Sequence, residues 1–180
     1  MNRIRRILPA VVALLGFRSE ARAQAPADDQ AGKQLRQMVL GTTAKDLGLA
    51  ASPQFPRVFG VVMDWPVGAQ IASVVALADG TASLYTTSTF GIIGGQAHES
   101  VRKAGRAFIG VAERYFEDAT RTTSHPYPAE GKIAFYLLCY DGTRVLGAAL
   151  EPTQAGSSKH AALFGAGQEV LTQLRKTVGR

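Results

Sequence analysis

Residues 71–88 read Ile71-Ala-Ser-Val-Val-Ala-Leu-Ala-Asp-Gly-Thr-Ala-Ser-Leu-Tyr-Thr-Thr-Ser88. The run before Asp79-Gly80 is almost entirely apolar, and Val, Ile, Tyr and Thr are the residues that favour strands. An Asp-Gly pair between two such runs is a strong hairpin signal, because a type I′ turn needs positive φ at both central residues. We therefore predict antiparallel strands over 71–78 and 82–89.

The same pattern recurs on both sides of this hairpin. Residues 58–63 form an apolar run rich in Val and Phe, and Asp-Trp-Pro-Val-Gly at 64–68 predicts a turn after it. Residues 132–140 are again strongly apolar, and Asp141-Gly142 predicts a second hairpin that returns over 143–150. The chain is therefore expected to contain five strands in two groups.

Helical spacing of apolar residues separates and flanks these groups. A long central helix is expected from Glu99 to about Asp118, and a C-terminal helix after Ser158. A short helix before Gly41 would bury one apolar face, formed by Ala31, Leu35, Met38 and Val39. The fold class is therefore α+β: a five-stranded, mainly antiparallel sheet packed with the central and C-terminal helices.

The N-terminus has the features of a secretory signal peptide. Arg3, Arg5 and Arg6 precede an apolar run at 7–17, and Ala21-Arg-Ala23 fits an A-x-A cleavage site. We predict a signal peptide at 1–23, a linker at 24–30 and a single domain at 31–180. The protein is then exported, to the periplasm or outside the cell. The alternative is a cytoplasmic protein whose N-terminal tail is disordered.

Charge and cysteine content restrict the function. The formal net charge is +6, but five arginines against one glutamate give residues 1–23 a charge of +4, which leaves +2 for the rest. Such a weak excess does not predict nucleic-acid binding. The apolar run at 7–17 is too short to span a bilayer, so no membrane span is expected. The single cysteine, Cys139, excludes an internal disulfide.

The element order, the Gly-Val-Val strand at 60–62 and the hairpin at 72–85 resemble a roadblock-type, profilin-like domain. The resemblance covers about residues 31–178. Domains of this type pack a five-stranded antiparallel sheet against helices, with a long helix between two groups of strands. The resemblance implies a non-enzymatic scaffold that forms dimers or binds a partner such as a small GTPase.

The segment 91–100 is the candidate ligand site. It joins a hydroxyl-rich strand to a helix N-terminus, where free N–H groups can hold an anion. Gly94 and Gly95 would expose these groups, and Gln96 and His98 would add side-chain donors. Neither a P-loop nor a dinucleotide-binding pattern is present. The alternative is that the glycines let the strand bend and the helix pack closely.

Two features are candidates for partner binding. Trp65, the only tryptophan, would anchor a protein partner if exposed, or close the edge of the core if buried. Arg102, Lys103 and Arg106 form a basic cluster at the start of the central helix. This cluster would contact an acidic partner, or it belongs to a solvated face of mixed charge.

No catalytic constellation emerges from the residue pattern. Cys139 lies within an apolar strand, and a buried thiol has a raised pKa. His98, His125 and His160 are too scattered to predict a metal site, and no cofactor is expected. The favoured function is a non-catalytic interaction or scaffold domain that self-associates, as a homodimer, or binds a protein partner. The alternative is a protein or enzyme that uses the segment 91–100 to bind a small anionic ligand.

Overall fold

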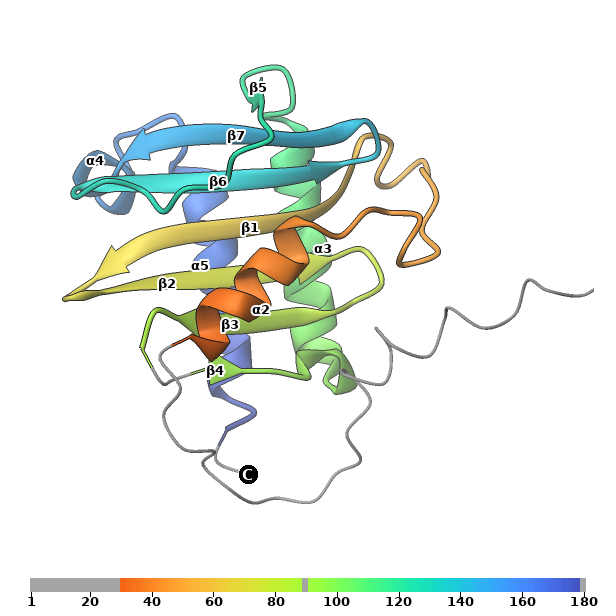
Figure 1. Ribbon diagram of the computed structural model, residues 1–180, viewed down its shortest axis with the longest axis horizontal. Coiled ribbons are helices and arrows are strands. Elements are labelled where there is room, and N and C mark those ends of the chain that lie inside the picture. Colours follow the sequence, from red (N-terminus) through yellow and green to blue (C-terminus); the bar gives the residue numbers. More distant parts are fainter. Residues whose placement is uncertain (1–29, 89–90, 179–180) are drawn as a thin grey trace, which may run out of the picture.

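The computed structural model describes residues 30–88 and 91–178 (Figure 1). The predicted signal peptide at 1–23, and all of the predicted linker except Gln30, lie outside the described residues. None of the helices in the described ranges is long and apolar enough to cross a membrane.

The described residues form one antiparallel sheet with helices on both faces, which confirms the α+β class. The sheet has the strand order β4-β3-β2-β1-β6-β7-β5, and neighbouring strands are antiparallel throughout. The strands are β1 (Val58–Val67), β2 (Gln70–Leu77), β3 (Ala82–Thr86), β4 (Gly91–Ile92), β5 (Thr120–Arg121), β6 (Lys132–Cys139) and β7 (Gly142–Ala149).

The prediction of five strands was wrong, because the described part of the sheet has seven. The two additional strands, β4 and β5, contain two residues each and lie at opposite edges of the sheet. Two residues are too few to show an alternating pattern, so the sequence carries no signal for them. Short strands at both edges limit the exposed backbone that could pair with another chain.

The predicted turn at 64–68 was also wrong in part. Strand β1 continues through Asp64 and Trp65 to Val67, and the chain turns only at Gly68, where φ is +61°. Asp64 is of a type that is rare inside a central strand. It is tolerated here because its carboxylate forms an ion pair with Arg36.

Both predicted hairpins are present, but their turns differ from the expected type I′. The Gly80 N–H donates to the Leu77 carbonyl at 3.0 Å, so Ala78 and Asp79 form the centre of the first turn. Gly80 then follows with a φ of +93°. In the second hairpin Cys139 pairs with Gly142, which has a φ of +120°. Glycine therefore supplies the left-handed residue after each turn rather than within it.

Four α-helices and one short 3-10 helix, η1, occur in the described residues. They are α2 (Ala31–Leu40), η1 (Gly95–Ala97), α3 (Glu99–Glu113), α4 (Leu150–Gln154) and α5 (Ala161–Arg175). Helices α3 and α5 lie side by side behind the sheet in Figure 1, whereas α2 crosses the opposite face alone. The predicted central and C-terminal helices are confirmed as α3 and α5, although α3 ends at Glu113 rather than near Asp118.

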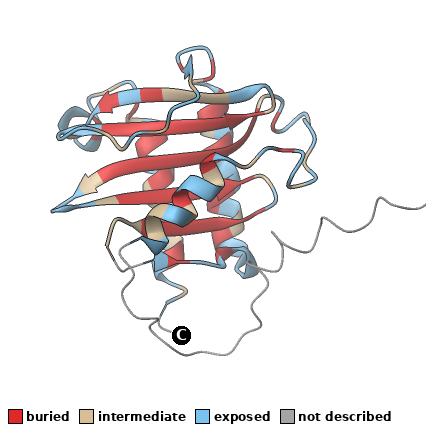
Figure 2. Cartoon of the chain, in the orientation of Figure 1, coloured by how far each residue is buried: buried red, intermediate tan, exposed pale blue. Residues whose placement is uncertain are grey.

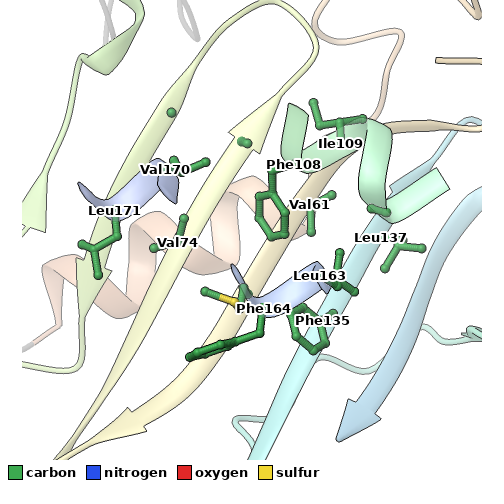
Figure 3. Packing of buried hydrophobic residues seen from close by; sticks show 14 of the residues in the cluster. Val61, Val74, Phe108, Ile109, Phe135, Leu137, Leu163, Phe164, Val170 and Leu171 are labelled. Carbon is green, nitrogen blue, oxygen red and sulfur yellow. The ribbon is translucent and has the colours of Figure 1, made fainter. Parts of the chain in front are cut away.

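The main core lies between the sheet and the pair α3 and α5. Phe108 and Ile109 of α3 and Leu163 of α5 meet Val61 and Phe135 of the sheet, all of them almost completely buried (Figure 3). A second, smaller core lies under α2 and includes Phe59, Val62 and Tyr136. The central strands are therefore buried on both faces, as Figure 2 shows.

Candidate functional site

The predicted ligand turn around Gly94 and Gly95 has a structural explanation. Gly94 has a φ of +89°, which favours glycine. Gly95 is buried, and a Cβ atom there would lie 2.6 Å from Leu174 Cδ2 and 2.7 Å from Val101 Cγ1. Gly95 therefore lets η1 pack against α3 and α5. Both glycines are required by geometry, whether or not a ligand binds.

Two of the backbone donors of this turn are already used. The Ala97 N–H donates to the Gly94 carbonyl at 3.3 Å, and the His98 N–H donates to the Gly95 carbonyl at 3.0 Å. The exposed Glu99 places a carboxylate in the first turn of α3. The Glu99 carboxylate would repel an anion at this helix N-terminus, so the charge there does not favour an anion site.

The other two predicted ligand residues, Gln96 and His98, lie at the same turn. The Gln96 side-chain oxygen accepts a hydrogen bond from the Thr81 hydroxyl at 3.3 Å. The backbone carbonyl of Gln96 accepts one from Arg102 at 2.6 Å. His98 is exposed. Gln96 therefore helps to hold the turn through contacts within the protein.

Trp65 belongs to the main core. It is only 4% exposed and packs edge-on against Phe164, with 6.2 Å between the ring centroids and 87° between the ring planes. An indole buried in this way cannot reach a partner unless the core opens. Trp65 therefore closes the core beside α5, and the structure does not bring it together with the basic cluster of α3.

The basic cluster lies in an open groove of about 540 Å³ between α3 and the segment that leads into β1. Arg102, Lys103 and Arg106 line one end of this groove, together with the acidic Glu99. Gln54 and Phe55 contribute to the opposite wall. We call this feature the α3 groove. The sequence predicted the basic residues but not the wall formed by Gln54 and Phe55. That wall arises where the segment 50–57 packs on α3, and a local sequence pattern does not indicate such a tertiary contact.

The charges of the α3 groove are only partly compensated. Arg102 forms an ion pair with Glu99 and also donates to the Gln96 carbonyl. Lys103 and Arg106 are exposed, and neither forms an ion pair within the described residues. The groove therefore presents two cations that are free to interact with an anionic group.

A buried ion pair occupies the opposite face of the sheet, where the sequence predicted no charged group. Arg36 of α2 and Asp64 of β1 are both fully buried, and the Arg36 Nε and Nη2 atoms donate to Asp64 Oδ2 at 2.9 and 2.5 Å. The Ser73 hydroxyl donates to the other carboxylate oxygen at 2.5 Å. The predicted inner face of α2 was therefore wrong in detail, since Met38 is 49% exposed and Arg36 is buried.

Arg36 also holds the irregular segment 122–131 onto the sheet. Its Nη1 atom donates to the His125 carbonyl at 3.0 Å. Its guanidinium carbon lies 4.2 Å from the ring centroid of Tyr127 and 5.4 Å from that of Tyr136. Arg36 thus joins α2, the sheet and the 122–131 segment at a single point.

Two buried groups that could carry chemistry, Asp64 and Cys139, are both held in an unreactive state. Burial raises the pKa of Asp64, against the hydrogen bonds and charge of Arg36 and the hydrogen bond of Ser73. Both carboxylate oxygens already accept hydrogen bonds, so Asp64 is committed to Arg36 and Ser73. Burial also raises the pKa of Cys139 to about 12, which keeps the thiol protonated. Within the described ranges no group of three His, Cys, Asp or Glu residues could hold a metal ion.

Comparison with known proteins identifies no relative. No protein-family model, curated protein or solved structure matches the chain. The resemblance to roadblock-type domains therefore stays a prediction. The function must be inferred from the geometry and charge of the α3 groove.

Proposed function

We propose that this protein is a non-catalytic interaction domain that binds an anionic protein partner in the α3 groove. The observation that carries the proposal is the pair Lys103 and Arg106, which are exposed in a groove and have no acidic partner among the described residues. Complementary charge on a partner would speed its association and select against cationic competitors. The predicted partner residues Arg102 and Arg106 both belong to this site.

A different protein fits this groove better than a second copy of the same chain. A symmetric dimer places the same patch of each subunit face to face. This patch is lined by three basic residues, Arg102, Lys103 and Arg106, and by one acidic residue, Glu99, so two copies would bring an excess of positive charge together, which is unfavourable. The short edge strands β4 and β5 also leave little backbone for pairing of two sheets. We therefore favour a heterologous partner over self-association.

Binding to poly-L-glutamate at low salt tests the proposal. We expect the wild-type protein to bind, and Lys103→Gln/Arg106→Gln to bind about ten-fold more weakly, because each exposed ion pair contributes up to ~1 kcal/mol. Glutamine preserves the helix propensity of the replaced residues. Arg114→Gln is the matched control, because Arg114 is also exposed and follows α3 but does not line the groove.

The control variant should bind within about two-fold of the wild type, since a charge outside the groove contributes little. Added salt should weaken binding of the wild type more than that of the double variant. Equal binding by all three proteins would show that the attraction is a property of the whole surface, and the proposal would be rejected.

A further inference from the structure

We infer that the α3 groove recognises a short peptide segment in which an acidic residue is followed by a small apolar residue. This inference rests on the proposed function and specifies the partner. Its basis is the unequal ends of the groove: one end carries three basic residues and one acidic residue, Glu99, and the other is formed by small or apolar residues.

The cationic end selects a carboxylate. Arg102 is held by Glu99 and by the Gln96 carbonyl, so it is already committed. Lys103 and Arg106 lie three positions apart on α3, and such residues are neighbours on a helix surface. One carboxylate can therefore interact with both side chains at once. These two residues provide the charge recognition.

The opposite end provides room for an apolar side chain. Ala107 and Gly110 of α3 carry little or no side chain there, and Phe55 lines the groove beside them. A Cβ atom built on Gly110 would have no heavy atom within 4 Å, so the space above this residue is open. An apolar side chain placed there would lie on the helix surface, beside the small exposed edge of Phe55 and away from the cations.

The length and surroundings of the groove favour a peptide over a nucleic acid. From Lys103 to Gly110 a helix rises about 10 Å, which three or four extended residues span. Beyond Gly110 the helix carries Glu113, and Glu117 follows; both are paired with Arg57, at 3.1 and 3.0 Å. Among the described residues that line the groove, no further free cation continues the basic track, so a long phosphate backbone would lose its favourable contacts.

Fluorescence anisotropy with four labelled probes tests the inference. The probes are peptides containing Glu-Glu-Ala-Leu, Glu-Glu-Gly-Gly and Lys-Lys-Ala-Leu, and a single-stranded oligonucleotide of mixed sequence. We expect the first to bind at least about ten-fold more tightly than each of the others, because it alone satisfies both ends of the groove.

Two substitutions of Gly110 separate the ends of the groove. Gly110→Leu fills the open space and should weaken binding of Glu-Glu-Ala-Leu about ten-fold, while binding of poly-L-glutamate stays within about two-fold. Gly110→Ala should preserve both interactions and raise Tm, because alanine is the better helix former. Thermal unfolding of each variant checks that the fold is retained.

The outcomes distinguish the two proposals. If Glu-Glu-Gly-Gly binds as tightly as Glu-Glu-Ala-Leu, or Gly110→Leu has no effect, the groove recognises charge alone and this inference is overturned. Tighter binding of the oligonucleotide would overturn it as well. The proposed function fails separately, if Lys103→Gln/Arg106→Gln leaves binding of poly-L-glutamate unchanged.

Discussion

The two faces of the sheet are stabilised in different ways. Between the sheet and helices α3 and α5, the core is large and apolar, built from residues such as Phe108, Leu163 and Phe135. Under α2, a single short helix covers a smaller core that contains the fully buried pair Arg36–Asp64. The first face depends on many contacts of similar kind, whereas the second depends on one specific arrangement of polar groups.

This difference determines how each face responds to substitution. Removing volume from an apolar core lowers the free energy of unfolding by an amount that grows with the cavity left behind. Adding volume lowers it too, because the larger side chain strains its neighbours. A buried ion pair responds to the loss of its partner, because the remaining charge stays buried without compensation. Replacement of both charged groups by apolar residues is therefore expected to lower the free energy of unfolding less than replacement of one of them.

The largest expected effect is on the α2 face. We predict that Asp64→Ala lowers the free energy of unfolding by about 3–5 kcal/mol, because it leaves the buried Arg36 guanidinium without its carboxylate. Urea denaturation followed by circular dichroism would measure this change. The double variant Arg36→Met/Asp64→Leu should be clearly more stable than Asp64→Ala. If the double variant is as unstable as Asp64→Ala, the α2 face does not depend on the pairing of Arg36 with Asp64, and the proposed difference between the two faces is wrong.

A smaller effect is expected on the α3 and α5 face. Gly95→Ala would place a methyl group against Leu174 and Val101, and overpacking of this kind costs about 1–3 kcal/mol. Gly110→Ala makes the same change in open space and should be neutral or stabilising by up to ~1 kcal/mol. Comparison of the two midpoints of thermal unfolding isolates packing from helix propensity. Equal midpoints would mean that Gly95 is not required for packing.

The smallest effect is a dependence of stability on pH at the α2 face. Burial, and then the charge of Arg36, lower the pKa of His125 below its usual 6.5. The unfolded chain therefore binds a proton more readily than the folded one, so stability should fall as the pH drops from about 7 through about 6. His125→Gln should reduce this slope, measured as the urea midpoint at several pH values.

His160 provides the comparison for this measurement. Burial also lowers its pKa, but it lies at the start of α5, on the opposite face. His160→Gln should remove a separate part of the slope, and the two substitutions should be additive because the sites share no partner. A slope that survives both substitutions would have to come from other groups.

The sequence was sufficient for the two hairpins and for helices α3 and α5, but not for the short edge strands or for the α2 face. The hairpins and the helices α3 and α5 have local signals, in turn residues and in apolar spacing. Arg36 and Asp64 are 28 positions apart, and each looks exposed when its own segment is considered alone. The pair becomes buried only when α2 packs on β1 and brings Arg36 against Asp64. No local sequence pattern indicates this tertiary contact.

The candidate site was predicted to a similar extent. The basic residues Arg102 and Arg106 were visible as a cluster on a helix, and they line the α3 groove. The groove itself depends on Phe55, which packs there from a segment without regular structure. Gly94 and Gly95 were predicted to bind a ligand because glycine-rich turns can bind anions. In the structure Gly94 is explained by its backbone conformation and Gly95 by close packing.

Arg36 has a consequence for the order in which the chain becomes ordered. Helix α2 precedes every strand in sequence, yet its arginine bonds to Asp64, 28 residues later, and to His125, 89 residues later. Loops of this length close late, because their entropy must be overcome before the contacts form. We therefore expect α2, the first helix to be synthesised in the described chain, to be fully held in place only when the segment 122–131 reaches it.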